Sequence, residues 1–172
     1  SAMNIRVAIL TISDRSSQGE RADLSGPALA DLIAQQGWVV ANREIVPDEL
    51  PVIKSKLVEW ADSGQVDLVL TTGGTGFSPR DITPEATQMV ISRSAPGIAE
   101  EMRPASVQLT PHAKMSRAVA VIRARTIIIN LPGSPKAACE NLMVALPVIP
   151  HAVQLLNEDP DSEAGHQLQS PF

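Results

Sequence analysis

The sequence has few cysteines, few aromatic residues and no long apolar runs. Its 172 residues include one cysteine, so no internal disulfide can form, which is usual for a reducing compartment. It has no tyrosine, two tryptophans and two phenylalanines, too few for an aromatic platform that stacks single-stranded nucleic acid. Apolar runs such as residues 143–149 fall far short of the ~20 residues that span a bilayer. We therefore expect neither a disulfide scaffold nor a membrane-spanning protein.

The net charge and the lack of a signal-peptide pattern argue against further classes of protein. The 14 Lys and Arg against 19 Asp and Glu give a net charge of −5, which argues against binding a nucleic-acid backbone by charge. The segment after Met3 lacks the pattern of a signal peptide, so a cytoplasmic protein is expected. The histidines His112, His151 and His166 lack metal-ligand spacing, and we expect surface or packing roles for them.

Short apolar runs alternate with helical patterns along the chain. The helical patterns begin near Asp23, Ile53, Pro84, Gly97 and Pro135, with Thr83 predicted as an N-cap and Pro104 predicted to interrupt its helix. Prolines 147 and 150 are expected to kink or restart the last helix. The predicted strands are Arg6–Ile12, Val39–Val46, Val66–Leu70, Ala118–Ile122 and Thr126–Asn130.

This alternation predicts the fold class. Strands separated by single helices pair in parallel through right-handed crossovers. We therefore predict one α/β domain over residues 4–157, with a doubly wound, mostly parallel sheet and helices on both faces. Residues 158–172 are mostly polar and are predicted to form a flexible tail.

Three predicted strand ends carry unusual chemistry, at Ser13–Arg15, Thr71–Gly76 and Asn130–Lys136. In open α/β sheets ligands bind at the carboxyl ends of strands, where glycines let a phosphate approach the backbone. The loop Gly73-Gly74-Thr75-Gly76 matches neither a P-loop nor the dinucleotide fingerprint. Any phosphate must therefore be bound in another way.

Two carboxylates belong to the same region of the predicted sheet. Asp81 lies inside the glycine-rich segment, and Asp48 follows the second strand. Acids beside phosphates repel them unless a cation lies between, and Mg²⁺ bound by carboxylates and water is the usual solution. Asp48 and Asp81 are therefore candidate Mg²⁺ ligands.

Each of these residues also has a purely structural explanation. The glycines suit a tight turn, and Asp48 suits the positive end of a helix dipole. Ser134 is at least as well explained as an N-cap, and Ser116-Arg117 as a solvated pair. The clustering of glycines with Arg80 and Asp81 favours a binding site over a bare turn.

The motifs together resemble the MogA/MoaB family of molybdenum-cofactor biosynthesis proteins over nearly all of residues 6–156. The matching segments are Thr71–Thr75, Arg80–Thr87, Pro96-Gly97, Ser116-Arg117 and Asn130–Ser134. Ile12–Arg15 and Pro47–Glu49, paired with Arg80-Asp81, look more like the adenylyltransferase branch. The resemblance implies the molybdopterin-binding fold, and adenylylation of molybdopterin by Mg²⁺-ATP with release of pyrophosphate.

The resemblance also implies roles for individual residues. Asp81 and Asp48 would be the catalytic, Mg²⁺-associated acids, directly or through water. The nucleotide would contact Thr72, Gly73, Gly74, Thr75 and Gly76. Molybdopterin and its phosphate would contact Ser13, Asp14, Ser116, Arg117, Pro132, Gly133 and Ser134.

The resemblance further implies a homotrimer and a separate molybdate-insertion domain or protein. Two alternatives from other classes use the same pocket: a carrier that binds molybdopterin without transferring AMP, and a scaffold that presents it to enzymes. ATP-dependent release of pyrophosphate in the presence of molybdopterin separates the enzyme from both.

Overall fold

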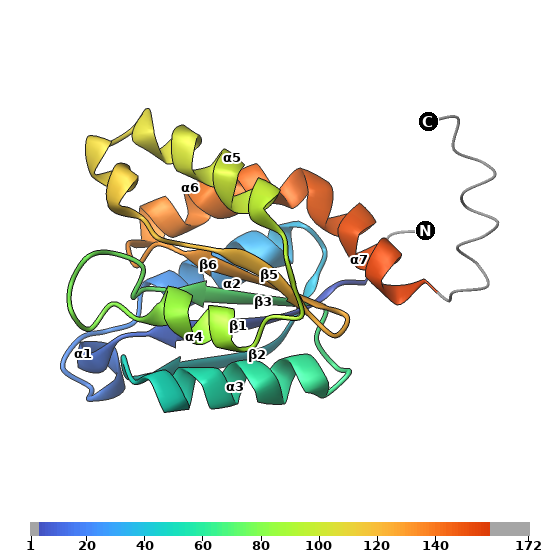
Figure 1. Ribbon diagram of the computed structural model, residues 1–172, viewed down its shortest axis with the longest axis horizontal. Coiled ribbons are helices and arrows are strands. Elements are labelled where there is room, and N and C mark those ends of the chain that lie inside the picture. The colour runs from blue at the N-terminus through green and yellow to red at the C-terminus, as the bar shows by residue number, and fades with distance from the viewer. Residues whose placement is uncertain (1–3, 159–172) are drawn as a thin grey trace.

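The sheet has six strands in the order β2-β1-β3-β6-β5-β4 (Figure 1). The computed structural model describes residues 4–158. Strands β1, β2, β3 and β6 are parallel, whereas β5 and β4 continue the sheet antiparallel. The strands are β1 (Arg6–Ile12), β2 (Val39–Val46), β3 (Leu68–Thr72), β4 (Arg93–Ser94), β5 (Ala120–Arg123) and β6 (Thr126–Leu131).

The central strands are apolar on both faces because both faces are covered. Along β1, Val7 and Ile9 join one core cluster, while Ala8, Leu10 and Ile12 join the other. Every residue of β3 and β6 is buried, as expected of strands between two helical layers. The edge strand β2 is mostly exposed.

The helices form two layers. One core cluster contains residues of α2, α5, α6 and α7, and the other contains residues of α3 and α4, so these groups cover opposite faces (Figure 1). This arrangement confirms the predicted fold class. The helical elements are α1 (Asp14–Ser17), α2 (Ser25–Gln35), α3 (Leu50–Asp62), α4 (Thr83–Met89), α5 (Pro96–Val107), η1 (Pro111–Met115), α6 (Pro135–Ala145), η2 (Leu146–Val148) and α7 (Ile149–Asn157).

Two local predictions were wrong. Thr83 is not the N-cap of α4: that position belongs to Ile82, and the Thr83 hydroxyl donates instead to the Gly73 carbonyl at 2.9 Å. Pro104 lies inside a continuous α5 rather than interrupting it. A proline costs a helix one hydrogen bond, and α5 is held by its packing on α6, where the Asn141 amide donates to Ser106 at 2.6 Å.

The third strand is displaced from its predicted position. It covers Leu68–Thr72 rather than residues 66–70, because Thr71 and Thr72 pair with Asn130 and Leu131 of β6. The short elements α1 and β4 were not predicted; each is too short to show a periodic pattern.

The C-terminal helices form a long apolar stretch. Residues 135–157 span 23 residues and contain an 18-residue window with a mean hydropathy of 1.3, long and apolar enough by length and composition to cross a membrane. The helix is broken by η2, where Pro147 and Pro150 were expected to kink or restart it. Its residues Ala138, Leu142, Ile149 and Val153 belong to the core, and 28% of the apolar window is buried. Of the predicted tail, residues 159–172 lie outside the described part of the chain.

Candidate active site

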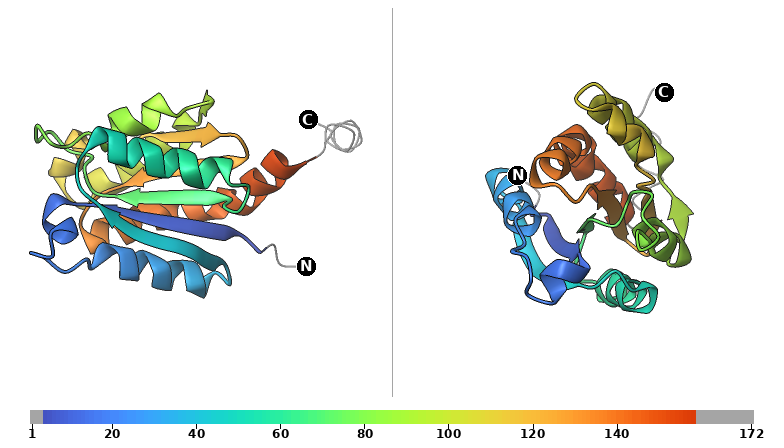
Figure 2. Two further views of the ribbon diagram at one scale, coloured as in Figure 1. Left: turned by 90° about the horizontal axis from the view of Figure 1, so that it is seen from below. Right: turned by 90° about the vertical axis from the view of Figure 1, so that its left-hand side faces the viewer.

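The polar crevice of the molecule lies where the strand order reverses. The chain runs outward from β1 to β2 on one side and to β3 on the other, and ligands bind at such switch points in open α/β sheets. The right-hand view of Figure 2 looks onto this end of the sheet. The crevice has a volume of about 230 Å³, and its lining includes Ser13, Asp48, Thr72, Gly73, Gly74, Asp81 and Gly133.

The glycine-rich loop has its shape for a steric reason. Gly73 and Gly74 adopt φ values of +103° and +69°, which favour glycine. A Cβ on Gly73 would lie 2.3 Å from the Ile12 carbonyl oxygen, and one on Gly74 would lie 2.3 Å from Thr83 Oγ1. The structural explanation of a tight turn therefore accounts for both glycines, and it also brings the loop backbone against the end of β1.

A second loop closes against the first. The Thr72 hydroxyl donates to the Pro132 carbonyl at 2.6 Å, and Gly73 N–H donates to the Leu131 carbonyl at 3.1 Å. A Cβ on Gly133 would lie 3.4 Å from Gly73 Cα, so the two backbones are in contact. The ends of β3 and β6 thus form one continuous wall.

The carboxylate of Asp48 is fixed by the backbone. Its Oδ2 accepts from Asp14 N–H at 3.0 Å, while Oδ1 lies 3.1 Å from the place a Cβ on Gly74 would take. Burial raises the pKa of Asp48. The charges of Asp14 and Asp81 raise it further, whereas the hydrogen bond from Asp14 N–H lowers it. The Asp48 carboxylate does not cap α3, because the N-cap position is Glu49 and no side chain accepts a hydrogen bond there. The carboxylate therefore faces the crevice.

The second carboxylate approaches from the glycine-rich loop. Asp81 Oδ2 accepts from Ser78 N–H at 3.0 Å and lies 2.9 Å from the place a Cβ on Gly76 would take. Asp48 and Asp81 line the same crevice and are close enough for the charge of Asp81 to raise the pKa of Asp48. The sequence prediction that they converge is thus matched by their placement.

The donor set of this crevice suits a hard cation. Three carboxylates line the crevice, those of Asp23, Asp48 and Asp81. Both oxygens of Asp23 already accept hydrogen bonds, from the Thr11 hydroxyl at 2.8 Å and from Gly26 N–H at 3.0 Å. Oxygen ligands completed by water and substrate phosphates are what Mg²⁺ prefers. Within residues 4–158, no group of three or more His, Cys, Asp or Glu side chains converges as a metal site. A cation here would therefore depend on phosphate oxygens as well as on Asp48 and Asp81.

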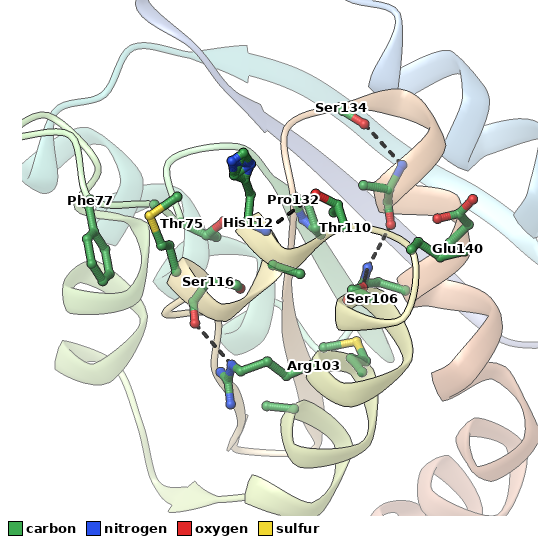
Figure 3. Close-up of a pocket in the computed structure, with 18 residues that line it drawn as sticks. Thr75, Phe77, Arg103, Ser106, Thr110, His112, Ser116, Pro132, Ser134 and Glu140 are labelled. Atoms are coloured by element: carbon green, nitrogen blue, oxygen red, sulfur yellow. Dashed lines mark hydrogen bonds between the residues drawn. The ribbon is translucent and has the colours of Figure 1, made fainter.

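An apolar cavity of about 360 Å³ lies on the other side of the glycine-rich loop (Figure 3). Helices α5 and α6, η1 and the two loops form its walls, and its size is within the range of small-molecule sites. Of the predicted residues, it contains Thr75, Gly76, Ser116, Pro132 and Ser134. The residues that sequence reasoning missed include Phe77, Met102, Arg103, Leu109, Thr110 and Asn141.

Two predicted ligand-binding residues are engaged by the protein itself. The Arg117 guanidinium donates to the Gly76 carbonyl at 2.8 Å, to the Asp81 carbonyl at 2.6 Å and to Glu85 at 2.6 Å. The Asp14 carboxylate accepts from Arg80 and from Asp48 N–H. Neither Asp14 nor Arg117 is among the lining residues of the two cavities.

Ser134 takes its expected structural role. Its hydroxyl oxygen accepts from Ala137 N–H at 3.1 Å and caps α6 (Figure 3). It also lines the apolar cavity, so the cap and a ligand contact are compatible.

Doubly wound α/β proteins typically bind ligands in a crevice at the switch point of the sheet, and small-molecule sites are typically concave and mostly apolar. The crevice and the apolar cavity therefore define this chain as a ligand-binding α/β protein. Residues 8–151 match the family described as "Probable molybdopterin binding domain". The chain belongs to this family of molybdenum-cofactor biosynthesis proteins, which includes MogA and MoaB.

Several relatives are similar over most of the chain. It is 44% identical over 154 residues to the molybdopterin adenylyltransferase of Helicobacter pylori strain J99, covering 88% of each chain. It is 45% identical to gephyrin of Dictyostelium discoideum, in a match that covers 91% of this chain and 23% of gephyrin. The solved structure of the molybdopterin biosynthesis enzyme MoaB from Thermus thermophilus is 51% identical, with a TM-score of 0.84 over 91% of this chain and 98% of that one.

Proposed function

We propose that the protein is a molybdopterin adenylyltransferase, which transfers AMP from ATP to the terminal phosphate of molybdopterin and releases pyrophosphate. The observation that carries the proposal is the convergence of Asp48 and Asp81 on a glycine-lined crevice at the switch point of the sheet. The name of the Helicobacter pylori relative supports the same reaction.

In this proposal each of the two cavities binds a different substrate group. The triphosphate would lie in the polar crevice against Gly73 and Gly74, and the pterin ring in the apolar cavity. The loop from Thr72 to Gly76 separates the cavities and contributes to both, which supports a reaction between groups bound on either side of it. Ser116, Pro132 and Ser134 would then contact molybdopterin.

The chemistry requires positioning more than proton transfer. An oxygen of the molybdopterin phosphate forms a bond to the α-phosphorus of ATP, and the bond from that phosphorus to the bridging oxygen breaks with its electrons leaving on pyrophosphate. The nucleophile is already ionised at neutral pH, so no strong base is needed. Asp48 and Asp81 would hold Mg²⁺, which supplies charge neutralisation between the two phosphate groups.

The apolar cavity needs an ordered wall, and two side chains supply it. Arg103 donates to the Ser116 carbonyl at 3.0 Å (Figure 3) and to the Ala118 carbonyl at 2.8 Å, which joins α5 to the segment before β5. The Asn141 amide donates to Ser106 and joins α6 to α5. These bonds fix α5 relative to α6 and to the segment before β5, which supports use of the cavity as a preformed ring site.

We further propose a homotrimer acting in the cytoplasm, with molybdate inserted by a separate domain or protein. Support for self-association comes from an apolar surface on which the exposed side chains of Val148 and Leu155 lie beside the half-buried Ile98. Such patches mark protein contacts. Light scattering coupled to size-exclusion chromatography should give three times the chain mass; a monomer would contradict this part of the proposal.

The decisive assay measures ATP-dependent release of pyrophosphate with molybdopterin present. The wild-type protein should release it, and Asp81→Asn should fold normally yet lose most turnover because the cation is misplaced. Glu59→Gln, an exposed change of the same kind on α3, is the matched control and should retain full activity. Binding of molybdopterin without release of pyrophosphate would favour the carrier instead.

A further inference from the structure

Arg80 precedes the proposed cation ligand Asp81, but its side chain contacts Asp14 and Asp48. Its Nη2 donates to Asp14 Oδ1 at 3.0 Å and to the Asp48 carbonyl at 3.1 Å, and its Nε donates to Asp14 Oδ2. One guanidinium therefore ties the glycine-rich loop to the segments that follow β1 and β2.

Asp14 and Asp48 also hold each other. Asp14 N–H donates to Asp48 Oδ2 at 3.0 Å, and Asp48 N–H donates to Asp14 Oδ1 at 2.9 Å. This exchange uses one oxygen of each carboxylate. The other oxygen, Asp48 Oδ1, lies beside Gly74, 3.1 Å from the place that a Cβ on Gly74 would take. The backbone N–H of Asp14 thus orients the Asp48 carboxylate, while the Asp14 carboxylate fixes the backbone at Asp48 from which that side chain projects.

Asp14 in turn depends on Arg80. Without a cation at its side, Asp14 would add a third negative charge next to Asp48 and Asp81, and repulsion would drive it outward. The bidentate guanidinium fixes the plane of the Asp14 carboxylate as well as neutralising it. Lysine could supply the charge but not the two-point contact.

We propose that Arg80 and Asp14 are a positioning pair that aims the free oxygen of Asp48 at the cation and nucleotide phosphates. This rests on the proposed function, because it assigns no ligand other than Mg²⁺-ATP. The pair touches neither substrate and acts through Asp48. Partners of this kind, one step removed from a metal, typically change metal affinity by about 10- to 100-fold.

A rival explanation gives Arg80 a direct role. Its side chain is 60% exposed and its Nη1 makes no hydrogen bond among the described residues, so it could leave Asp14 and bind a phosphate itself. The two roles predict opposite effects for Asp14. Removing the Asp14 charge disables a positioning pair, whereas it frees a phosphate-binding arginine.

The test is a double-mutant cycle with Arg80→Gln and Asp14→Asn, read by calorimetry of ATP with Mg²⁺ and of ATP with EDTA. We expect each single variant to weaken Mg²⁺-ATP binding about 10-fold, and the double variant to bind no more weakly than either. Binding of metal-free ATP should change less than about 2-fold, since the pair acts through the metal ligand. Arg80→Lys should restore only part of the affinity.

A matched control exists at the other end of the molecule. Arg123 donates in the same bidentate way to Asp62, at 3.0 and 2.9 Å, and to the Val90 carbonyl at 3.0 Å. Arg123→Gln removes an equivalent ion pair, so it should match Arg80→Gln in melting temperature while leaving Mg²⁺-ATP affinity at the wild-type value.

Each other outcome overturns a defined statement. Arg80→Gln weakening metal-free ATP as much as Mg²⁺-ATP, with Asp14→Asn strengthening both, would replace the positioning pair by a phosphate-binding arginine. Unchanged affinity in both variants, with only the melting temperature lowered, would reduce the pair to a structural salt bridge. Wild-type protein that binds no Mg²⁺-ATP would overturn the proposed function itself.

Discussion

Gly74→Ala tests the close packing on which the crevice depends. At this residue φ is +69°, and a Cβ would lie 2.3 Å from Thr83 Oγ1 and 3.1 Å from Asp48 Oδ1. The backbone term alone, an alanine in the left-handed region, costs about 1–2 kcal/mol. The contact with Thr83 adds to this, because its hydroxyl must move away from the Gly73 carbonyl that it now binds.

The size of the second term follows from burial. Thr83 is fully buried, so a displaced hydroxyl leaves itself and the Gly73 carbonyl without water as a substitute. Such a loss costs about 1–3 kcal/mol. Gly64 provides the control, because its φ of +72° is nearly the same and no atom lies within 4 Å of its Cβ position. Gly64→Ala therefore isolates the backbone term.

Urea denaturation of the two variants gives the comparison. We expect Gly74→Ala to lose about 1–3 kcal/mol more than Gly64→Ala, or roughly 2–10 °C more in melting temperature. Gly74→Ala should also weaken nucleotide binding, since its methyl group would displace Asp48, whereas Gly64→Ala should not. Equal destabilisation by the two variants would refute the packing described around Gly74.

Three further predictions concern other named contacts. Burial raises the pKa of Asp67, but the hydrogen bonds and charge of Arg6 outweigh it and leave the pKa below its ordinary value. The ionised Asp67 carboxylate therefore stabilises the fold at pH values above the ordinary carboxyl pKa of about 3.9, and this contribution is lost as the pH falls further. Asp67→Asn should lower the free energy of unfolding by about 1–3 kcal/mol at pH 7 and by progressively less below pH 4. A difference between variant and wild type that widens in acid would contradict this. Asn130→Ala removes two buried side-chain hydrogen bonds of 3.0 Å and leaves Val119 N–H unpaired, so urea denaturation should show a loss of about 2–4 kcal/mol, and a loss below about 1 would be inconsistent with that network. Arg117→Lys cannot keep all three of its contacts, so amides of the glycine-rich loop should exchange hydrogen faster; unchanged exchange would show that Arg117 does not hold the loop.

The order of helices and strands was predictable because buried strands require apolar residues at successive positions of the sequence. Runs such as Arg6–Ile12 are apolar on successive residues only because helices cover both faces of the sheet. The convergence of Asp48 and Asp81 was also predictable, since both follow parallel strands whose carboxyl ends share one side of the sheet. Their spacing of 33 positions along the chain is irrelevant to that rule.

The apolar cavity was not predictable from the sequence. Met102 and Leu109 have the apolar side chains of core residues, and only the packing of α5 on α6 and of η1 on α5 decides that they face a cavity. The role of Arg117 was equally hidden, because its contacts with Gly76 and Asp81 reach back 41 and 36 residues. Side-chain reach of this kind leaves no periodic signal.

The Thr83 prediction was wrong for a related reason. Local sequence favours a threonine before Pro84 as an N-cap. In the fold, the Gly73 carbonyl lies within hydrogen-bonding distance of the Thr83 hydroxyl, which donates to it instead of accepting from the helix. Long-range contact thus overrode a local preference at the point where the glycine-rich loop meets α4.

The most direct test of the central claim is a crystal soaked with Mn²⁺ and a non-hydrolysable ATP analogue. Manganese replaces Mg²⁺ and gives an anomalous signal that places it independently of the nucleotide. We expect a manganese peak between Asp48 and Asp81, with the triphosphate against Gly73 and Gly74. A nucleotide whose phosphates lie elsewhere, or a bound triphosphate whose manganese contacts neither carboxylate, would contradict it.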